Sequence, residues 1–223
     1  MTLVHWDDVE GFDIPGDMQP LGGHWQRLAD AAGSVGLGAH RVRLEPGQMI
    51  TPPHRHSTEE EIFHLLTGSA TLWQDGATCT VAAGDTIVHE AGGARKTGLN
   101  RIALPANEEG APPHCHSADE EVFVVLDGEG TLELWGPPKP GSAPATEPQE
   151  THAVRRGHVV ARPPGTRISH CLRSGAGGLT YLAYGTKEPN DVCYYPRSNK
   201  IFWRGLGLIA RLEPLDYFDG EPS

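Results

Sequence analysis

The chain has 223 residues and a formal net charge of −11, with 29 acidic residues against 18 basic ones. This balance would repel a phosphate backbone, and no local run of lysine and arginine offsets it, so nucleic acid is not an expected partner. The sequence has no apolar run long enough for a membrane span, and its first residues are acidic where a signal peptide needs basic ones. A cytoplasmic protein without membrane contact is therefore predicted.

Cysteine usage and turn-forming residues narrow the fold class. The four cysteines, at positions 79, 115, 171 and 193, show no CxxC spacing, so reduced thiols are expected. The 28 glycines and 19 prolines separate short alternating segments such as EIFHLL, VFVVL and LTYLAYG. This pattern predicts an all-β protein of short strands joined by turns. Residues 24–33 are the one helix-like stretch near the start, and the sequence leaves open whether they form a helix or a loop.

The next feature along the chain is the segment PPHRHSTEEEIFHLLTG at residues 52–68. Nearly the same words return as PPHCHSADEEVFVVLDG at residues 112–128, with ten of the seventeen positions identical at an offset of 60. The match extends upstream, where residues 40–54 align with 100–114, and downstream through SATLW and EGTLELW. Two copies of one supersecondary unit are therefore predicted.

The two copies then diverge and rejoin. Copy two carries the Pro-rich insertion GPPKPGSAPATEPQE at residues 136–150, which is predicted to be either a lid or a linker. The copies rejoin at residues 80–99 and 153–172, where Gly84 aligns with Gly157. The repeat is thus interrupted by one insertion only.

The repeated histidines carry the chemistry. Residues two apart on a strand point to the same side, so His54 and His56, like His114 and His116, can present both imidazoles to one point. A carboxylate follows on the next predicted strand in each copy. Two nitrogens and one oxygen that converge suit a divalent first-row metal ion.

These motifs resemble those of the cupin family, and the chain looks like a bicupin, with two cupin domains in one chain. The family's first motif is G(x)5-6HxH(x)3-4E(x)6G. Copy one matches it at Gly47, His54, His56, Glu61 and Gly68. Copy two matches it at His114, His116, Glu121 and Gly128, with the leading glycine displaced to Gly110.

The second cupin motif, G(x)5PxG followed by a histidine, is matched in copy two only. The matching residues are Gly157, Pro163, Gly165 and His170, with the histidine two residues later than the commonest spacing. In copy one Glu90 replaces the proline, and Thr97 stands where His170 would be. His89 is an alternative fourth ligand there.

The resemblance implies two tandem double-stranded β-helix, or jelly-roll, barrels. The first would cover residues 1–97, and the second residues 98–223, including the insertion and a C-terminal extension from residue 186. The preferred metal site, in the C-terminal barrel, would use His114, His116, Glu121 and His170. A weaker N-terminal site would use His54, His56 and Glu61.

The resemblance also implies a cofactor and a range of functions. The cofactor would be one divalent transition metal, either Mn, Fe, Ni, Co, Cu or Zn, and a second ion in the N-terminal cupin is an alternative. The leading hypothesis is an enzyme acting on a small oxygen-rich organic substrate, with dioxygenase chemistry ranked before isomerase, decarboxylase or lyase chemistry. The other hypothesis is a non-catalytic bicupin that binds a metal, sugar or metabolite. A homodimer is expected because cupins commonly dimerise.

The C-terminal tail resembles the extension of an uncharacterised group of bacterial cupins. The shared positions are Gly185, Thr186, Pro189, Asp191, Tyr195 and Pro196. The apolar runs IFW and LGLIARL predict that the tail packs on a barrel or on a partner subunit.

Within the acidic run STEEE, a role is predicted only for the last member, Glu61. Cys115 is predicted to point away from the metal.

Overall fold

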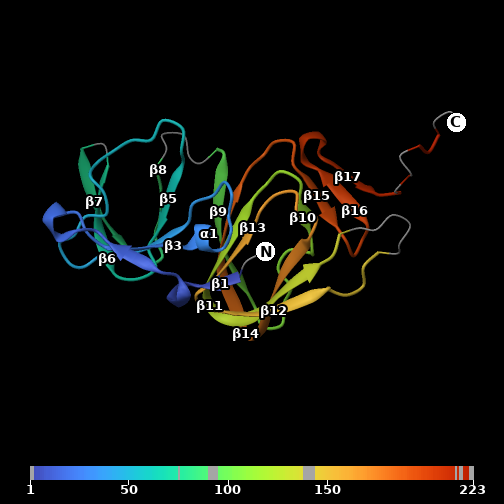
Figure 1. Cartoon of the computed structure of the whole chain (residues 1–223), viewed down its shortest axis with the longest axis horizontal. Coiled ribbons are helices and arrows are strands. Elements are labelled where there is room, and N and C mark those ends of the chain that lie inside the picture. The colour runs from blue at the N-terminus through green and yellow to red at the C-terminus, as the bar shows by residue number, and fades with distance from the viewer. Residues whose placement is uncertain are drawn as a thin grey trace.

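The structure is a computed structural model that describes residues 3–74, 76–89, 95–137, 144–213, 215 and 218–220. These residues form β-strands, one short α-helix and three 3₁₀ turns, which confirms the predicted all-β class. Figure 1 shows two β lobes side by side, with the second lobe continuing into the C-terminal tail. In the described part of the chain, no helix is long and apolar enough to cross a membrane.

The second lobe is built on a six-stranded sheet. Its order is β1-β13-β11-β14-β9, and β12 pairs with β11. The strands are β1 (Leu3–His5), β9 (Thr97–Leu104), β11 (Glu121–Trp135), β12 (Glu150–Arg155), β13 (His158–Arg162) and β14 (Ser169–Thr186).

Strands β11 and β14 are far longer than the short strands predicted, with 15 and 18 residues. Their pairing shifts register between Val125 and Asp127, and again between Gly128 and Gly130. Such irregularities bend a strand and increase its twist, so one strand can continue around the lobe where shorter strands were expected. Gly128 has a φ of +78°, and an added Cβ would meet the Gly178 carbonyl oxygen at 2.2 Å. Only glycine fits this bend.

The interior of the second lobe is filled by apolar side chains at alternate strand positions. On β13, Val160 points inward, whereas Val159 and Ala161 pack on the outer face against Trp6 and helix α1 (Leu28–Ala31). The interior cluster consists of Phe123, Val125, Leu132, Leu134, Val154, Val160, Leu172, Leu179 and Tyr181.

The first residues of the chain belong to the second lobe. Strand β1 pairs antiparallel with β13, with Leu3 opposite Val160 and His5 opposite His158. The predicted boundary between residues 97 and 98 stays a prediction, but sheet pairing crosses it. Residues 1–39 lie outside the repeat, so the repeat could not reveal this pairing.

The first lobe consists of small sheets. Strand β2 (Gly11–Asp13) pairs with β3 (His24–Arg27), which pairs with β4 (His40–Arg43); β5 (Glu61–His64) pairs with β8 (Thr86–His89), and β6 (Ser69–Gln74) with β7 (Ala77–Ala82). The helix-like stretch 24–33 is thus strand β3 followed by α1. Among the described residues between 44 and 89, Val81 alone is buried. This lobe therefore has little core of its own.

The C-terminal tail pairs with the second lobe, but the apolar side chains that were predicted to pack there stay largely exposed, at 44% for Trp203, 67% for Leu206, 50% for Leu208 and 61% for Ile209. Strands β15 (Val192–Tyr195), β16 (Lys200–Trp203) and β17 (Leu208–Arg211) extend β10 (Cys115–His116) into a four-stranded sheet. The HxH strand of copy two is therefore covered by residues that follow the repeat. Residues 138–143 of the Pro-rich insertion, like Glu90, lie outside the described residues, so the choice between lid and linker stays open.

Candidate metal centre

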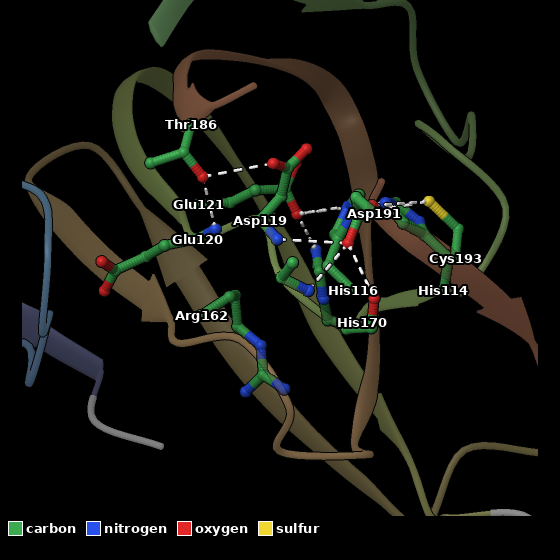
Figure 2. Close-up of polar contacts among 12 residues, drawn as sticks. His114, His116, Asp119, Glu120, Glu121, Arg162, His170, Thr186, Asp191 and Cys193 are labelled. Carbon is green, nitrogen blue, oxygen red and sulfur yellow. Dashed lines mark hydrogen bonds and ion pairs between the residues drawn. The ribbon is translucent and has the colours of Figure 1, made fainter. Parts of the chain in front are cut away.

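The four predicted ligands of the second copy meet at one point (Figure 2). The Nε2 atoms of His114, His116 and His170 lie 3.9, 3.3 and 2.9 Å from Oε2 of Glu121. His114 and His170 face each other in an antiparallel bridge, with backbone N···O distances of 2.8 and 3.2 Å. Glu121 is the first residue of β11. Three separate segments of the chain therefore supply the group.

The atoms that face one another in this centre are buried and have no hydrogen-bond partner. They include Nε2 of His116, Nε2 of His170 and Oε2 of Glu121. Buried polar atoms normally have hydrogen-bond partners. A convergence of buried nitrogen and oxygen atoms without such partners fits a bound metal cation. The His170 side chain is 4% exposed and the Glu121 side chain 22%, so the carboxylate lies on the more open side. Three imidazoles and one carboxylate suit a divalent transition metal.

The ionisation of these groups follows from burial and from their mutual contacts. Burial lowers the pKa of His170 to about 4, against the opposing charge of Glu121. Burial also disfavours the charged form of His116, but its contacts with Asp191 and Cys193 and the negative charge of Glu121 raise its pKa to about 12. The two histidines in turn hold the pKa of Glu121 well below its ordinary value, although burial opposes this. A metal ion would replace the proton on His116, so its binding releases protons.

Two acceptors orient the histidines. His116 Nδ1 donates to Oδ2 of Asp191 at 2.7 Å, and His114 Nδ1 donates to the Pro112 carbonyl at 2.8 Å. Both rings are thereby turned with Nε2 toward Glu121, an arrangement that fixes the tautomer of metal-binding histidines. Asp191 is fully buried, and its Oδ1 accepts from the backbone N–H of Ala118 at 2.8 Å. The tail motif contains Asp191, but no sequence pattern assigned it this role.

The predicted residues of the first copy also come together, in a more open setting. His54 Nε2 and His56 Nε2 lie 3.9 and 3.6 Å from Oε2 of Glu61, and their side chains are 38% and 34% exposed. The Thr97 hydroxyl, at the position of His170, donates to Glu60 instead. His89 lies opposite Glu61 in the β5 and β8 ladder, but it is not part of the donor group formed by the other three residues.

The acidic run holds residues that the sequence reasoning missed. The expectation that only Glu61 has a role was wrong, because Glu60 accepts four hydrogen bonds, and its counterpart Glu120 does the same. The donors to Glu60 are the N–H groups of Arg95, Lys96 and Thr97 and the Thr97 hydroxyl. Those to Glu120 are the N–H groups of Val35, Gly36 and Leu37 and the Ser34 hydroxyl. The sequence did hold a signal for this role, because Glu60 and Glu120 occupy equivalent positions in the repeat.

Cys115 lies beside this centre without joining it. The residue is buried, and its sulfur is not among the donor atoms that cluster with Glu121. Burial raises the pKa of the Cys115 thiol. The prediction that this side chain points away from the histidines agrees with this placement.

Comparisons with known proteins complete the description of the fold. Residues 40–98 match the family model described as Cupin domain. A search of curated proteins found no match. Among solved structures, a sugar phosphate isomerase of the cupin superfamily from Silicibacter pomeroyi shares 17% identity, covering 95% of this chain and 94% of that one, with a TM-score of 0.45.

Two further solved structures are similar over shorter stretches. A provisionally named sugar phosphate isomerase from Acidithiobacillus ferrooxidans shares 24% identity over 53% of this chain and 68% of that one, with a TM-score of 0.45. A cupin protein from Bacteroides fragilis shares 16% identity over 42% and 68%, with a TM-score of 0.33.

The chain is an all-β protein with a repeated histidine and glutamate motif, and its first copy matches the cupin domain directly. The cupin family match thus covers residues 40–98, and residues 112–128 repeat its histidine and glutamate motif.

Proposed function

We propose that the C-terminal centre holds one divalent transition metal and binds a small oxygen-rich organic molecule through it. The supporting observation is the convergence of three imidazole Nε2 atoms on Oε2 of Glu121, with buried members that have no other partner. When bound, the ion would act as a Lewis acid that polarises a coordinated oxygen.

The residues around the centre orient its ligands and exclude water on one side. Asp191 holds the His116 ring in place, and the backbone at Pro112 holds His114. Phe123 contacts the His170 ring at a centroid distance of 5.4 Å and contacts Tyr181 at 5.9 Å. Burial raises the pKa of Tyr181 to about 12, so this phenol keeps its proton at neutral pH. These aromatic rings exclude water from one side of the centre, so a ligand would approach from the side of His114 and Glu121.

Among the enzymatic possibilities, we favour isomerase, decarboxylase or lyase chemistry over the dioxygenase reaction ranked first from the family resemblance. The donor set accepts redox-active and redox-inactive ions alike. Lewis-acid activation of adjacent oxygens is the property that all of these ions share. The dioxygenase reaction, the homodimer and the cytoplasmic location stay predictions.

The first copy favours a second role, which is binding without catalysis. Its three donors are about one-third exposed, and Thr97 is engaged with Glu60. Exposed donors retain their water and gain less from a metal ion. We therefore propose that the N-terminal cupin contributes to architecture or to weak metal binding.

The test is calorimetric titration of a panel of small hydroxy acids and sugars into protein loaded with Mn²⁺, compared with protein treated with a chelator. At least one member should bind to the loaded protein and lose binding after chelation. The same loss is expected for His170→Ala, whereas His152→Ala, on the exposed β12 strand, should bind normally. Binding that is unaffected by chelation and by His170→Ala would contradict the proposal.

A further inference from the structure

Arg162 stands apart from the other basic residues of the chain. Its side chain is buried at 4% exposure, and it is the single buried cation among the lysines and arginines that the structure describes. A buried charge is stable only when it is paired or compensated. The surroundings of this guanidinium are therefore informative.

Strand register places Arg162 on the interior face of the second lobe. It lies directly opposite Glu121 in the ladder between β13 and β11, just as Val160 lies opposite Phe123. Val160 and Phe123 both belong to the interior cluster, and residues two apart on a strand share a face. Figure 2 shows Arg162 on the opposite side of the histidine group from Asp191.

The described protein atoms leave the guanidinium partly unpaired. Its Nη2 donates to the Ile168 carbonyl at 2.5 Å, two residues before His170. Its Nε is buried and has no hydrogen-bond partner. The carboxylate whose charge acts on it is Glu121, which belongs to the metal centre and forms no ion pair with it within the described chain. The nearby Cys115 thiol has a raised pKa and stays neutral.

The charge balance at this place favours an anion. The carboxylates of Glu121 and Asp191 together balance the charge of a divalent ion, so the Arg162 guanidinium remains as an additional positive charge in the same interior. The chain as a whole has a net charge of −11, so this positive interior is a local feature. Buried positive charge without a protein counter-ion is what an anionic ligand would compensate.

We propose that Arg162 binds a carboxylate group of the molecule held at the C-terminal centre, so that the ligands are small hydroxy- or oxo-carboxylates. This inference rests on the proposed function. A guanidinium matches a carboxylate in geometry and in charge, one for one. A phosphate dianion would call for a second cation, and no other buried lysine or arginine is found in the described residues.

The experiment uses the full chain loaded with Mn²⁺, with glycolate as the anionic probe and glycolamide as its neutral counterpart. Both affinities are measured by calorimetry in wild type, in Arg162→Met and in Arg101→Met, an exposed arginine on β9. Arg162→Met should weaken glycolate binding about tenfold or more and leave glycolamide within about twofold, because only glycolate can form a hydrogen-bonded charge pair with the guanidinium. Arg101→Met should change neither affinity.

Metal content measured on the same samples separates the possible failures. Wild type without bound metal would overturn the proposed function and this inference with it. Bound metal in every protein, with glycolate and glycolamide equally affected or equally unaffected by Arg162→Met, would overturn this inference alone. Tighter binding of inorganic phosphate than of glycolate, with the same dependence on Arg162, would overturn the carboxylate assignment.

A second variant guards against misfolding of Arg162→Met. Arg162→Lys keeps the charge but lacks the planar fork, so it should weaken glycolate binding by less than Arg162→Met and still bind metal. Two results for a metal-bound Arg162→Lys variant would show that the guanidinium has no role in recognition. One is an affinity for glycolate equal to that of wild type, and the other is an equal loss of affinity for glycolate and glycolamide.

Discussion

The two copies of the motif bring the same residue types to similar distances, yet their surroundings differ. The nearest histidine Nε2 in the first copy lies 3.6 Å from the glutamate oxygen, and the same His–Glu pair in the second copy lies 3.3 Å apart. The His56 side chain is 34% exposed, whereas that of His116 is 10% exposed. The motif thus brings the donor residues together in both copies. The chain segments that cover these residues determine how deeply they are buried, and therefore how much a bound metal ion would stabilise them.

The covering layer of the second copy comes from outside the repeat. Strand β15 of the tail pairs with β10, with Cys193 opposite His116, and it follows directly after Asp191. The nearest carboxylate to His56 Nδ1 is Glu59 at 3.3 Å, which is 77% exposed. An exposed charge pair contributes little because water screens it. The second centre is therefore better ordered before any metal binds.

The largest expected difference between the two copies is their response to removal of the metal. A metal at about a thousand times its dissociation constant stabilises the folded state by about 4 kcal/mol. Chelation should therefore increase amide hydrogen exchange in segments 112–123 and 168–174 and leave 52–64 unchanged. Mass spectrometry of peptic fragments measures this. An equal change in both copies would remove the distinction between them.

The contribution of the tail can be tested through Asp191. Asp191→Asn should weaken metal binding about 10- to 100-fold, because it removes the carboxylate that orients His116. Competition with a fluorescent chelator gives the affinity. Glu59→Gln, the counterpart beside His56, is the matched control and should leave the affinity unchanged. Equal effects of the two changes would show that burial of the acceptor is unimportant.

A smaller effect concerns the pH dependence of the first copy. Although desolvation opposes it, hydrogen bonds from residues 95–97 lower the pKa of Glu60 to about 2, from an ordinary value of 4.5. Because the folded pKa is the lower one, the stabilisation is complete above pH 4.5 and is lost as the pH falls toward 2.

Glu60→Gln should accordingly be less stable than wild type at pH 6, and the difference should shrink below pH 4.5. Urea unfolding at several pH values measures the free energy of unfolding. Glu45→Gln, an exposed carboxylate in the same lobe, should show no such gap. A difference for Glu60→Gln that does not vary with pH would contradict the assignment.

The last prediction concerns the difference in burial between the two copies, measured through the reactivity of their cysteines. Cys79 in the first copy is exposed, whereas Cys115, Cys171 and Cys193 are buried. Burial raises the pKa of Cys171 to about 12, which keeps it as an unreactive thiol. Iodoacetamide should modify one cysteine per folded chain quickly, and Cys79→Ser should abolish the fast phase. Rapid modification of a second cysteine in the folded protein would show that the second lobe is open.

The sequence allowed the fold class and the composition of both donor groups to be predicted, since spacing along a repeat carries that information. The placement of β1 in the second lobe was not predictable, because pairing between residues 3–5 and 158–160 leaves no local pattern. The roles of Glu60, Asp191 and Arg162 also depend on tertiary contacts. A buried arginine looks like a surface one until its strand register is known.

The most direct test of the central claim is metal content per chain, measured by mass spectrometry on untagged protein purified without chelator. Wild type and His54→Ala should each carry about one divalent transition metal ion, and His170→Ala should carry almost none, because the buried set then lacks one of its four donors. A metal content that is unchanged in His170→Ala, or that is lost in His54→Ala, would contradict the assignment of the metal to the C-terminal centre.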